Sequence, residues 1–293
     1  MKKILFSGSG VALVTPFTDD GVNFEVLSEL IDFQIDNETD AIIVCGTTGE
    51  PATMTDEEKR DVISFTVNRV NGRVPVIAGT GGNNTKAVIE SSKFAESAGA
   101  DGLLIVTPYY NKTTQRGLIA HYKAVAENVS LPIIVYNVPS RTGLNMTAKT
   151  AYELSKVENI VGIKEASGNF SQIAEIMDMC KDELYVYSGN DDQVVPILAL
   201  GGKGVISVSA NVIPNDVHNM VYSFLHGDIE RARKLQLMAL DLIKALFSEV
   251  NPIPVKEAVR QIGFDVGKCR MPLVDMEEEG QIRISEALQE YFK

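Results

Sequence analysis

Short apolar runs recur along the chain, and polar stretches with helical spacing separate them. Their first residues are Gly10, Ala41, Val74, Gly102, Pro132, Ile160, Leu184 and Gly204. Successive rather than alternate positions are apolar in these runs, which is typical of strands in a parallel sheet that is covered on both faces. The pattern therefore predicts eight buried parallel strands.

The stretches between these runs have ends that are typical of helices. Asn23 stands where a helix would begin, and Thr55 and Glu58 have the spacing of a capping box. Gly99 and Gly227 stand where helices should end. Alternating strands and helices give parallel strands joined by right-handed crossovers, and eight such units suit a closed barrel better than an open sheet. We predict the α/β fold class, with a (β/α)8 TIM barrel over residues 1–227.

The pattern changes after residue 227, where apolar residues continue at helical spacing without further strand-like runs. We therefore predict a C-terminal helical extension over residues 228–293. A length of 293 residues with 45% hydrophobic residues also suits two ordinary domains. The period of strand then helix favours one large barrel.

The composition of the chain limits which cellular compartments and which classes of partner are compatible with it. A formal net charge of −12 disfavours nucleic acid and anionic membranes, because both need a basic surface. The three cysteines are too few and too scattered for a disulfide framework, which suits a reducing compartment. The apolar run near the start is too short for a signal peptide, and no run approaches the roughly 18 residues of a membrane span. We expect a soluble, cytoplasmic protein.

Lys164 is the strongest chemical signal, because it lies on the apolar sixth strand at the end where barrel enzymes place their chemistry. Burial would lower the pKa of this amine and supply the neutral form that attacks a ketone to give an imine. The alternative is a lysine whose charged end reaches solvent at the barrel rim.

Hydroxyl groups follow the second and fourth strands. Thr47 and Thr48 lie in the segment Gly46–Glu50, where hydroxyls and backbone N–H groups would suit a carboxylate. A plain turn in which a threonine caps a helix explains the same residues. Tyr109 and Tyr110 lie in the loop after the fourth strand, where they are interface anchors, part of a site, or packed beneath the loop.

The fifth strand ends at Tyr136, and Arg141 follows it in the next loop. A guanidinium can hold a carboxylate through two hydrogen bonds, although surface arginines are also common. Thr47, Tyr110, Tyr136, Arg141 and Lys164 all fall at the carboxyl ends of predicted strands. This convergence favours one catalytic site.

The remaining candidates point to no metal or cofactor. His121, His218 and His226 are far apart and lack the spacing of metal ligands. Asp191 and Asp192 follow the seventh strand, and we expect them to cap the next helix.

Five motifs resemble one family over nearly the whole chain. They are Gly46-Thr-Thr-Gly-Glu50, Tyr136-Asn-Val-Pro139, Ser140-Arg-Thr-Gly143, Gly162-Ile-Lys-Glu-Ala166 and Ser188-Gly-Asn-Asp191. They are similar to those of the dihydrodipicolinate synthases, also called 4-hydroxy-tetrahydrodipicolinate synthases. This family belongs to the class I pyruvate lyase and aldolase superfamily, whose members share the lysine and the tyrosine.

The resemblance implies a role for each catalytic candidate. Lys164 would form a Schiff base with pyruvate, and Tyr136 would act as a general acid and base. Thr47 would link Tyr136 to Tyr110 in a proton relay, with Tyr110 entering from the neighbouring subunit. The implied assembly is a homotetramer of two tight dimers.

The resemblance also implies the substrates and their binding residues. Thr48 would hold the carboxylate of pyruvate, and the backbone at Gly189 and Ile206 would line the pocket near Lys164. Arg141 would bind the carboxylate of L-aspartate 4-semialdehyde. The implied reaction is the first committed step of diaminopimelate and lysine biosynthesis, with no cofactor and no metal.

One departure from the family concerns regulation. Lysine-inhibited relatives build an allosteric site from the equivalents of Tyr109 and Asn83, which are present, and from histidines and an acid. Those further positions read Pro51, Asp56, Lys59 and Ala87. The sequence therefore predicts weak or absent inhibition by lysine.

Two other functions remain open. Another pyruvate-dependent lyase, of the N-acetylneuraminate lyase or 2-keto-3-deoxygluconate aldolase type, would keep Lys164 and Tyr136 but generally lacks the run Ser140–Gly143. A non-catalytic barrel that binds keto acids would share the fold, because fold does not fix function.

Overall fold

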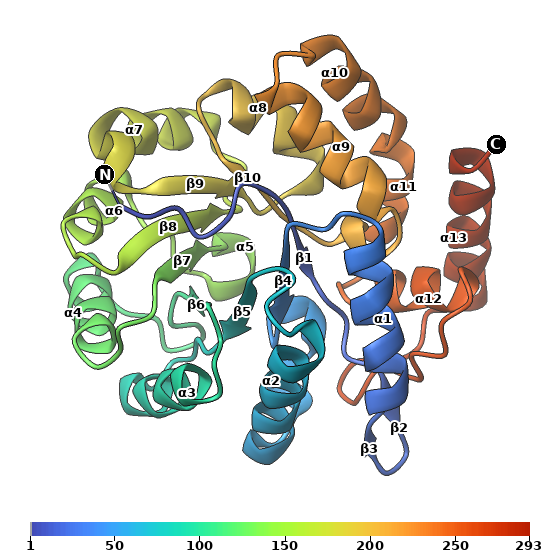
Figure 1. Ribbon diagram of the computed structural model, residues 1–293, viewed down its shortest axis with the longest axis horizontal. Coiled ribbons are helices and arrows are strands. Elements are labelled where there is room, and N and C mark those ends of the chain that lie inside the picture. The colour runs from blue at the N-terminus through green and yellow to red at the C-terminus, as the bar shows by residue number, and fades with distance from the viewer. Residues whose placement is uncertain (1) are drawn as a thin grey trace.

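A computed structural model describes residues 2–293 and shows a closed barrel of parallel strands wrapped by helices (Figure 1). Around the barrel the strand order is β1-β10-β9-β8-β7-β6-β5-β4. The strands are β1 (Gly8–Ala12), β4 (Ala41–Val44), β5 (Val76–Gly79), β6 (Gly102–Val106), β7 (Ile133–Asn137), β8 (Ile160–Glu165), β9 (Tyr185–Ser188) and β10 (Gly204–Ser207). All eight predicted strands, and the barrel that they form, are confirmed.

Helices connect the strands and cover the outside of the barrel (Figure 1). They are α1 (Phe24–Asp36), α2 (Asp56–Val70), α3 (Thr85–Ser97), α4 (Gln115–Ala126), the short α5 (Pro139–Thr142), α6 (Ala148–Ser155), α7 (Phe170–Cys180), α8 (Val194–Ala199) and α9 (Pro214–Leu225). Asn23 caps α1, and Thr55 with Glu58 forms the predicted capping box of α2. A small hairpin of β2 (Phe17–Thr18) and β3 (Gly21–Val22) was not predicted, because two-residue strands leave no period to detect.

The barrel interior is filled at its amino-terminal end, so chemistry is confined to the other end. The rings of Phe6 and Tyr187 stack with centroids 4.5 Å apart, and the Tyr187 hydroxyl donates to the Phe6 carbonyl at 2.6 Å. Ile206 and Tyr136 belong to the same buried inner cluster. The larger apolar layer lies between the strands and the surrounding helices.

Four helices follow the barrel, and the first of them packs against α9. They are α10 (Ile229–Met238), α11 (Leu240–Leu246), α12 (Ile253–Gln261) and α13 (Glu278–Tyr291). The predicted helical character of residues 228–293 is therefore observed. No helix within residues 2–293 is long and apolar enough to cross a membrane.

Candidate active site

Lys164 and Tyr136 face each other at the carboxyl ends of neighbouring strands. They are paired in the register of β7 and β8, and the Lys164 Nζ lies 4.4 Å from the centre of the Tyr136 ring. Lys164 is 5% exposed and Tyr136 is 6% exposed. The amine is thus buried against an aromatic face, and the alternative of a lysine that reaches solvent at the rim does not hold.

Burial changes the acidity of both groups. Desolvation lowers the pKa of Lys164 to about 8; the charge of Asp191 opposes this effect and that of Arg141 adds to it. Desolvation raises the pKa of Tyr136 to about 12, although Arg141 and the side chain of Thr47 act in the opposite direction. At neutral pH the site therefore combines a readily deprotonated amine with a protonated phenol.

The prediction that Asp191 and Asp192 cap the next helix was wrong, because the N-terminus of α8 has no side-chain cap. Asp191 instead contacts the segment after β10. Its Oδ2 accepts hydrogen bonds from the backbone N–H groups of Val208 (3.0 Å) and Ser209 (2.8 Å), which follow β10. Its Oδ1 is buried without a partner among residues 2–293, and burial raises the pKa of this carboxyl. A carboxyl group three residues after a buried strand was the signal that should have placed it near Lys164, whose pKa its charge raises.

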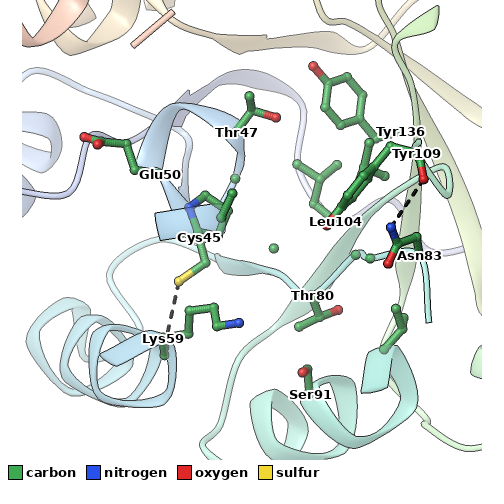
Figure 2. A pocket seen from close by; sticks show the side chains of 18 of the residues that line it. Cys45, Thr47, Glu50, Lys59, Thr80, Asn83, Ser91, Leu104, Tyr109 and Tyr136 are labelled. Atoms are coloured by element: carbon green, nitrogen blue, oxygen red, sulfur yellow. Dashed lines mark hydrogen bonds between the residues drawn. The ribbon is translucent and has the colours of Figure 1, made fainter. Parts of the chain in front are cut away.

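A cavity of about 550 Å³ is lined by Tyr136 but not by Lys164, and Figure 2 shows Thr47, Tyr136 and Tyr109 around it. Arg141 also lines the cavity, as the sequence predicts. The cavity extends from these residues toward Asn83, whose Nδ2 donates to the backbone carbonyl of Tyr109 at 3.3 Å. Thr47, Tyr136 and Arg141 thus meet at one opening.

Thr48 is buried, and its hydroxyl contacts the C-terminal extension. The Asn251 Nδ2 donates to the Thr48 Oγ1 at 3.0 Å, and the backbone carbonyl of Asn251 lies 3.5 Å from the Arg141 Nη2. Sequence reasoning missed Asn251, because an isolated polar residue between two predicted helices carries no recognisable motif. The structure brings it to the same cavity as Arg141.

Gly189 lies close to Lys164, but Thr48, Gly189 and Ile206 are not among the residues that line the cavity. A Cβ on Gly189 would stand 3.2 Å from the Lys164 Cε and 2.7 Å from the Ala166 Cβ. Any larger residue at position 189 would therefore press on the Lys164 side chain. Ile206 is fully buried in the inner cluster that also contains Tyr136.

Tyr110 is not brought into this site within one chain. It is 83% exposed, adopts a left-handed backbone with φ of 65°, and does not line the cavity. Its neighbour Tyr109 does line it. An exposed tyrosine in a loop beside a catalytic opening suits a contact with a second subunit.

Glu165 is a buried acid that follows Lys164 and that sequence reasoning did not assess. Its carboxylate accepts hydrogen bonds from the Asn137 amide (3.0 Å) and from the Ser167 backbone N–H (2.7 Å). Burial raises its pKa. These contacts fix the ends of β7 and β8, and with them the relative positions of Tyr136 and Lys164.

A buried ion pair fixes the Gly46–Glu50 segment. The Lys256 Nζ in α12 lies 2.8 Å from the Glu50 Oε1, and both side chains are almost fully inaccessible to solvent. The other Glu50 oxygen accepts from the Arg270 backbone N–H at 3.0 Å, and Lys256 also donates to the Lys268 carbonyl. The C-terminal extension therefore fixes the position of the Gly46–Glu50 segment, which carries Thr47 and Thr48.

The histidines serve local contacts. His121 Nδ1 pairs with the Thr85 hydroxyl and His218 Nδ1 with the Asp40 carboxylate, each at 2.9 Å. Within residues 2–293 no cluster of three or more His, Cys, Asp or Glu residues is suited to hold a metal ion.

A closed barrel with a buried lysine against a tyrosine at its carboxyl end is the arrangement of the class I lyases, which react through an amine. The chain belongs to the dihydrodipicolinate synthetase family, whose model matches residues 5–291.

Similar proteins span nearly the whole chain. The 4-hydroxy-tetrahydrodipicolinate synthase of Caldicellulosiruptor bescii is 60% identical over 98% of this chain and 97% of its own. That of Acetivibrio thermocellus is 57% identical over 99% of both chains. The crystal structure of dihydrodipicolinate synthase from Aquifex aeolicus is 48% identical, covers 98% of both chains and has a TM-score of 0.96.

Proposed function

We propose that the chain condenses pyruvate with L-aspartate 4-semialdehyde through a Schiff base on Lys164, giving 4-hydroxy-tetrahydrodipicolinate. The observation that carries this proposal is the buried Lys164 amine, with a pKa of about 8, against the ring of Tyr136 at the barrel mouth. The name that full-length relatives carry supports the choice of substrates. The reaction is the first committed step of diaminopimelate and lysine biosynthesis.

The neutral Lys164 amine attacks the keto carbon of pyruvate, and loss of water gives the imine. The protonated imine withdraws electrons, so that the methyl group loses a proton and becomes an enamine. The enamine carbon attacks the aldehyde carbon of the second substrate, whose oxygen takes up a proton. The substrate's own amine then attacks the imine carbon, closes the ring and releases Lys164 as the free amine.

Tyr136 transfers the protons in these reaction steps. With a pKa of about 12 its phenol is protonated at neutral pH, so it donates a proton at the start of the cycle and recovers one later. Thr47 connects it to Tyr110, which we place at the site of the neighbouring subunit. The exposure of Tyr110 in the single chain supports this placement.

The binding residues divide between the two substrates. Thr48 holds the pyruvate carboxylate, while Gly189 and Ile206 shape the space around the imine. Arg141, at the cavity opening, holds the carboxylate of the aldehyde substrate. Pro51, Asp56, Lys59 and Ala87 lack the histidines and the acid of inhibited relatives, which supports weak or absent inhibition by lysine.

The proposed organisation is a catalytic barrel over residues 1–227 with a helical extension over residues 228–293. The proposed assembly is a cytoplasmic homotetramer of two tight dimers. It needs no cofactor or metal and has no nucleic-acid or membrane partner; the net charge of −12 supports the last point.

Borohydride reduction in the presence of pyruvate tests the proposal. The expected result is one stable pyruvyl adduct, which peptide mapping assigns to Lys164 and which is lost in Lys164→Arg. An adduct on another lysine, or none, would refute the assignment. A panel of aldehydes then separates this function from the other pyruvate lyases, because only aspartate semialdehyde should turn over.

A further inference from the structure

Asn251 contacts two side chains to which the proposed function gives a substrate. It lies between α11 and α12, is 5% exposed, and donates through its Nδ2 to the Thr48 hydroxyl at 3.0 Å. Its backbone carbonyl lies 3.5 Å from the Arg141 guanidinium. Asn251 itself lines the cavity, so one residue of the C-terminal extension links the threonine proposed to bind pyruvate to the arginine proposed to bind the aldehyde substrate.

The amide of Asn251 constrains the hydroxyl of Thr48. An amide NH2 group can only donate, so the Thr48 oxygen must act as the acceptor in this contact. A hydroxyl has one hydrogen, and here that hydrogen is not used toward Asn251. It is left free to point at an acceptor elsewhere, and a carboxylate is an acceptor only.

The carbonyl oxygen of the Asn251 side chain lowers the stability of the fold. The Asn251 Oδ1 is buried and has no hydrogen-bond partner within residues 2–293. An unpaired buried acceptor destabilises a fold, so a structural role alone does not account for an amide at this position.

We propose that Asn251 is a positioning residue that sets the Thr48 hydroxyl as a hydrogen-bond donor to the carboxylate of pyruvate. This inference rests on the proposed function, because it requires that Thr48 bind that carboxylate. Asn251 acts through Thr48 and does not touch the reacting atoms. The C-terminal extension thereby contributes to substrate affinity.

Two substitutions test whether Asn251 is needed as a hydrogen-bond donor or only as a side chain that fills the space. Asn251→Ala removes the donor, and we expect the KM for pyruvate to rise roughly tenfold, which is the size of one lost hydrogen bond to a charged group. Asn251→Asp is nearly isosteric but accepts the Thr48 hydrogen, so its KM should rise further. In both variants kcat at saturating pyruvate should change less than KM, because the Lys164 amine is untouched.

A double-mutant cycle with Thr48→Val tests whether Asn251 acts through Thr48. If it does, Asn251→Ala adds no further increase in KM on the Thr48→Val background. Increases that multiply would overturn the proposal, and so would an unchanged KM in Asn251→Asp. If Asn251→Ala does not fold, the isosteric Asn251→Asp and its cycle with Thr48→Val still decide the question.

Asn159→Ala is the matched control. The Asn159 amide donates to the carbonyls of Ala126 (3.0 Å) and Val129 (2.9 Å), but it precedes β8 at the opposite end of the barrel. We expect it to lower the Tm without raising the KM for pyruvate. An equal rise in KM would show that the Asn251 effect is a general loss of structure.

Borohydride trapping of the wild-type enzyme keeps this inference separate from the proposed function. If no pyruvyl adduct forms on Lys164, the proposed function fails. If the adduct forms but the KM of Asn251→Asp is unchanged, only the role of Asn251 is wrong.

Discussion

Lys164 and Tyr136 occupy paired positions on adjacent parallel strands, with the Lys164 Nζ 4.4 Å from the centre of the Tyr136 ring. Side chains at paired positions of neighbouring parallel strands project to the same face of the sheet. Here that face is the barrel interior, which is dry enough to lower the pKa of the lysine and to raise that of the tyrosine. Burial at this one place therefore shifts the pKa values of the two groups in opposite directions.

The rate of imine formation should depend on pH through Lys164. Its pKa of about 8 means that the reactive neutral form is lost as the pH falls below that value. We expect the single-turnover trapping rate to fall by up to about tenfold per pH unit below the pKa and to level off above it. In Arg141→Ala the midpoint should move to higher pH, because the Arg141 charge helps to lower the pKa of Lys164.

Arg141→Lys is the control for this pH profile, since it keeps a positive charge at the same position. A wild-type midpoint near the ordinary pKa of lysine, about 10.4, would contradict the assignment of a desolvated amine. A midpoint that moves downward in Arg141→Ala would contradict the sign of the charge effect.

Arg141→Ala should impair the second substrate far more than the first. We expect kcat/KM for aspartate semialdehyde to fall about 10- to 100-fold, the loss of a charged hydrogen-bonding partner. Trapping of the pyruvyl imine, measured at about pH 9 to limit the change in protonation, should remain close to that of the wild type. Equal damage to both steps would remove Arg141 from the aldehyde side.

Tyr110 should act on the site of a neighbouring subunit, and hybrid dimers test this directly. Tyr110→Phe and Lys164→Ala each leave a homodimer without an intact site. In a mixed dimer, a site that takes Lys164 from one chain and Tyr110 from the other has both residues. Mixing the two variants after subunit exchange should therefore restore activity, and no recovery would place Tyr110 in its own chain's site or outside any site.

The buried pair of Glu50 and Lys256 should matter strongly for stability. Lys256→Met leaves the Glu50 carboxylate buried without its cation, and we expect a loss of about 3–5 kcal/mol in the free energy of unfolding. Lys244→Met, which breaks an exposed pair with Asp241, serves as the control and should change little. Denaturant unfolding measures both, and equal effects would contradict the importance of burial.

Lysine should inhibit weakly or not at all. Asn83 and Tyr109 line the cavity, but Pro51, Asp56, Lys59 and Ala87, which also line it, lack the histidines and the acid of inhibited relatives. A coupled assay with the next reductase of the pathway, run with and without lysine, measures the effect. Strong inhibition at physiological lysine concentrations would contradict this interpretation of the cavity.

The sequence predicted the features that depend on local periodicity. The regular spacing of the strands predicted that Lys164 and Tyr136 lie at one end of the barrel. The carboxyl ends of all barrel strands lie at the same end, and this does not depend on the loop sequences. Asp191 and Asn251 escaped prediction for a different reason. Their partners, Ser209 and Thr48, are 18 and 203 residues away, and no pattern within one helix or strand encodes such pairings.

The hydrogen bond between Thr48 and Asn251 joins residues that lie 203 positions apart. On a ribosome that adds about 5–20 residues per second, the second partner emerges roughly 10–40 s after the first. A nascent barrel whose strands have all been synthesised still lacks this contact and the Glu50–Lys256 pair. The proposed pyruvate pocket is therefore complete only when translation nears the end of the chain, and a chain that stops before residue 251 would lack both contacts.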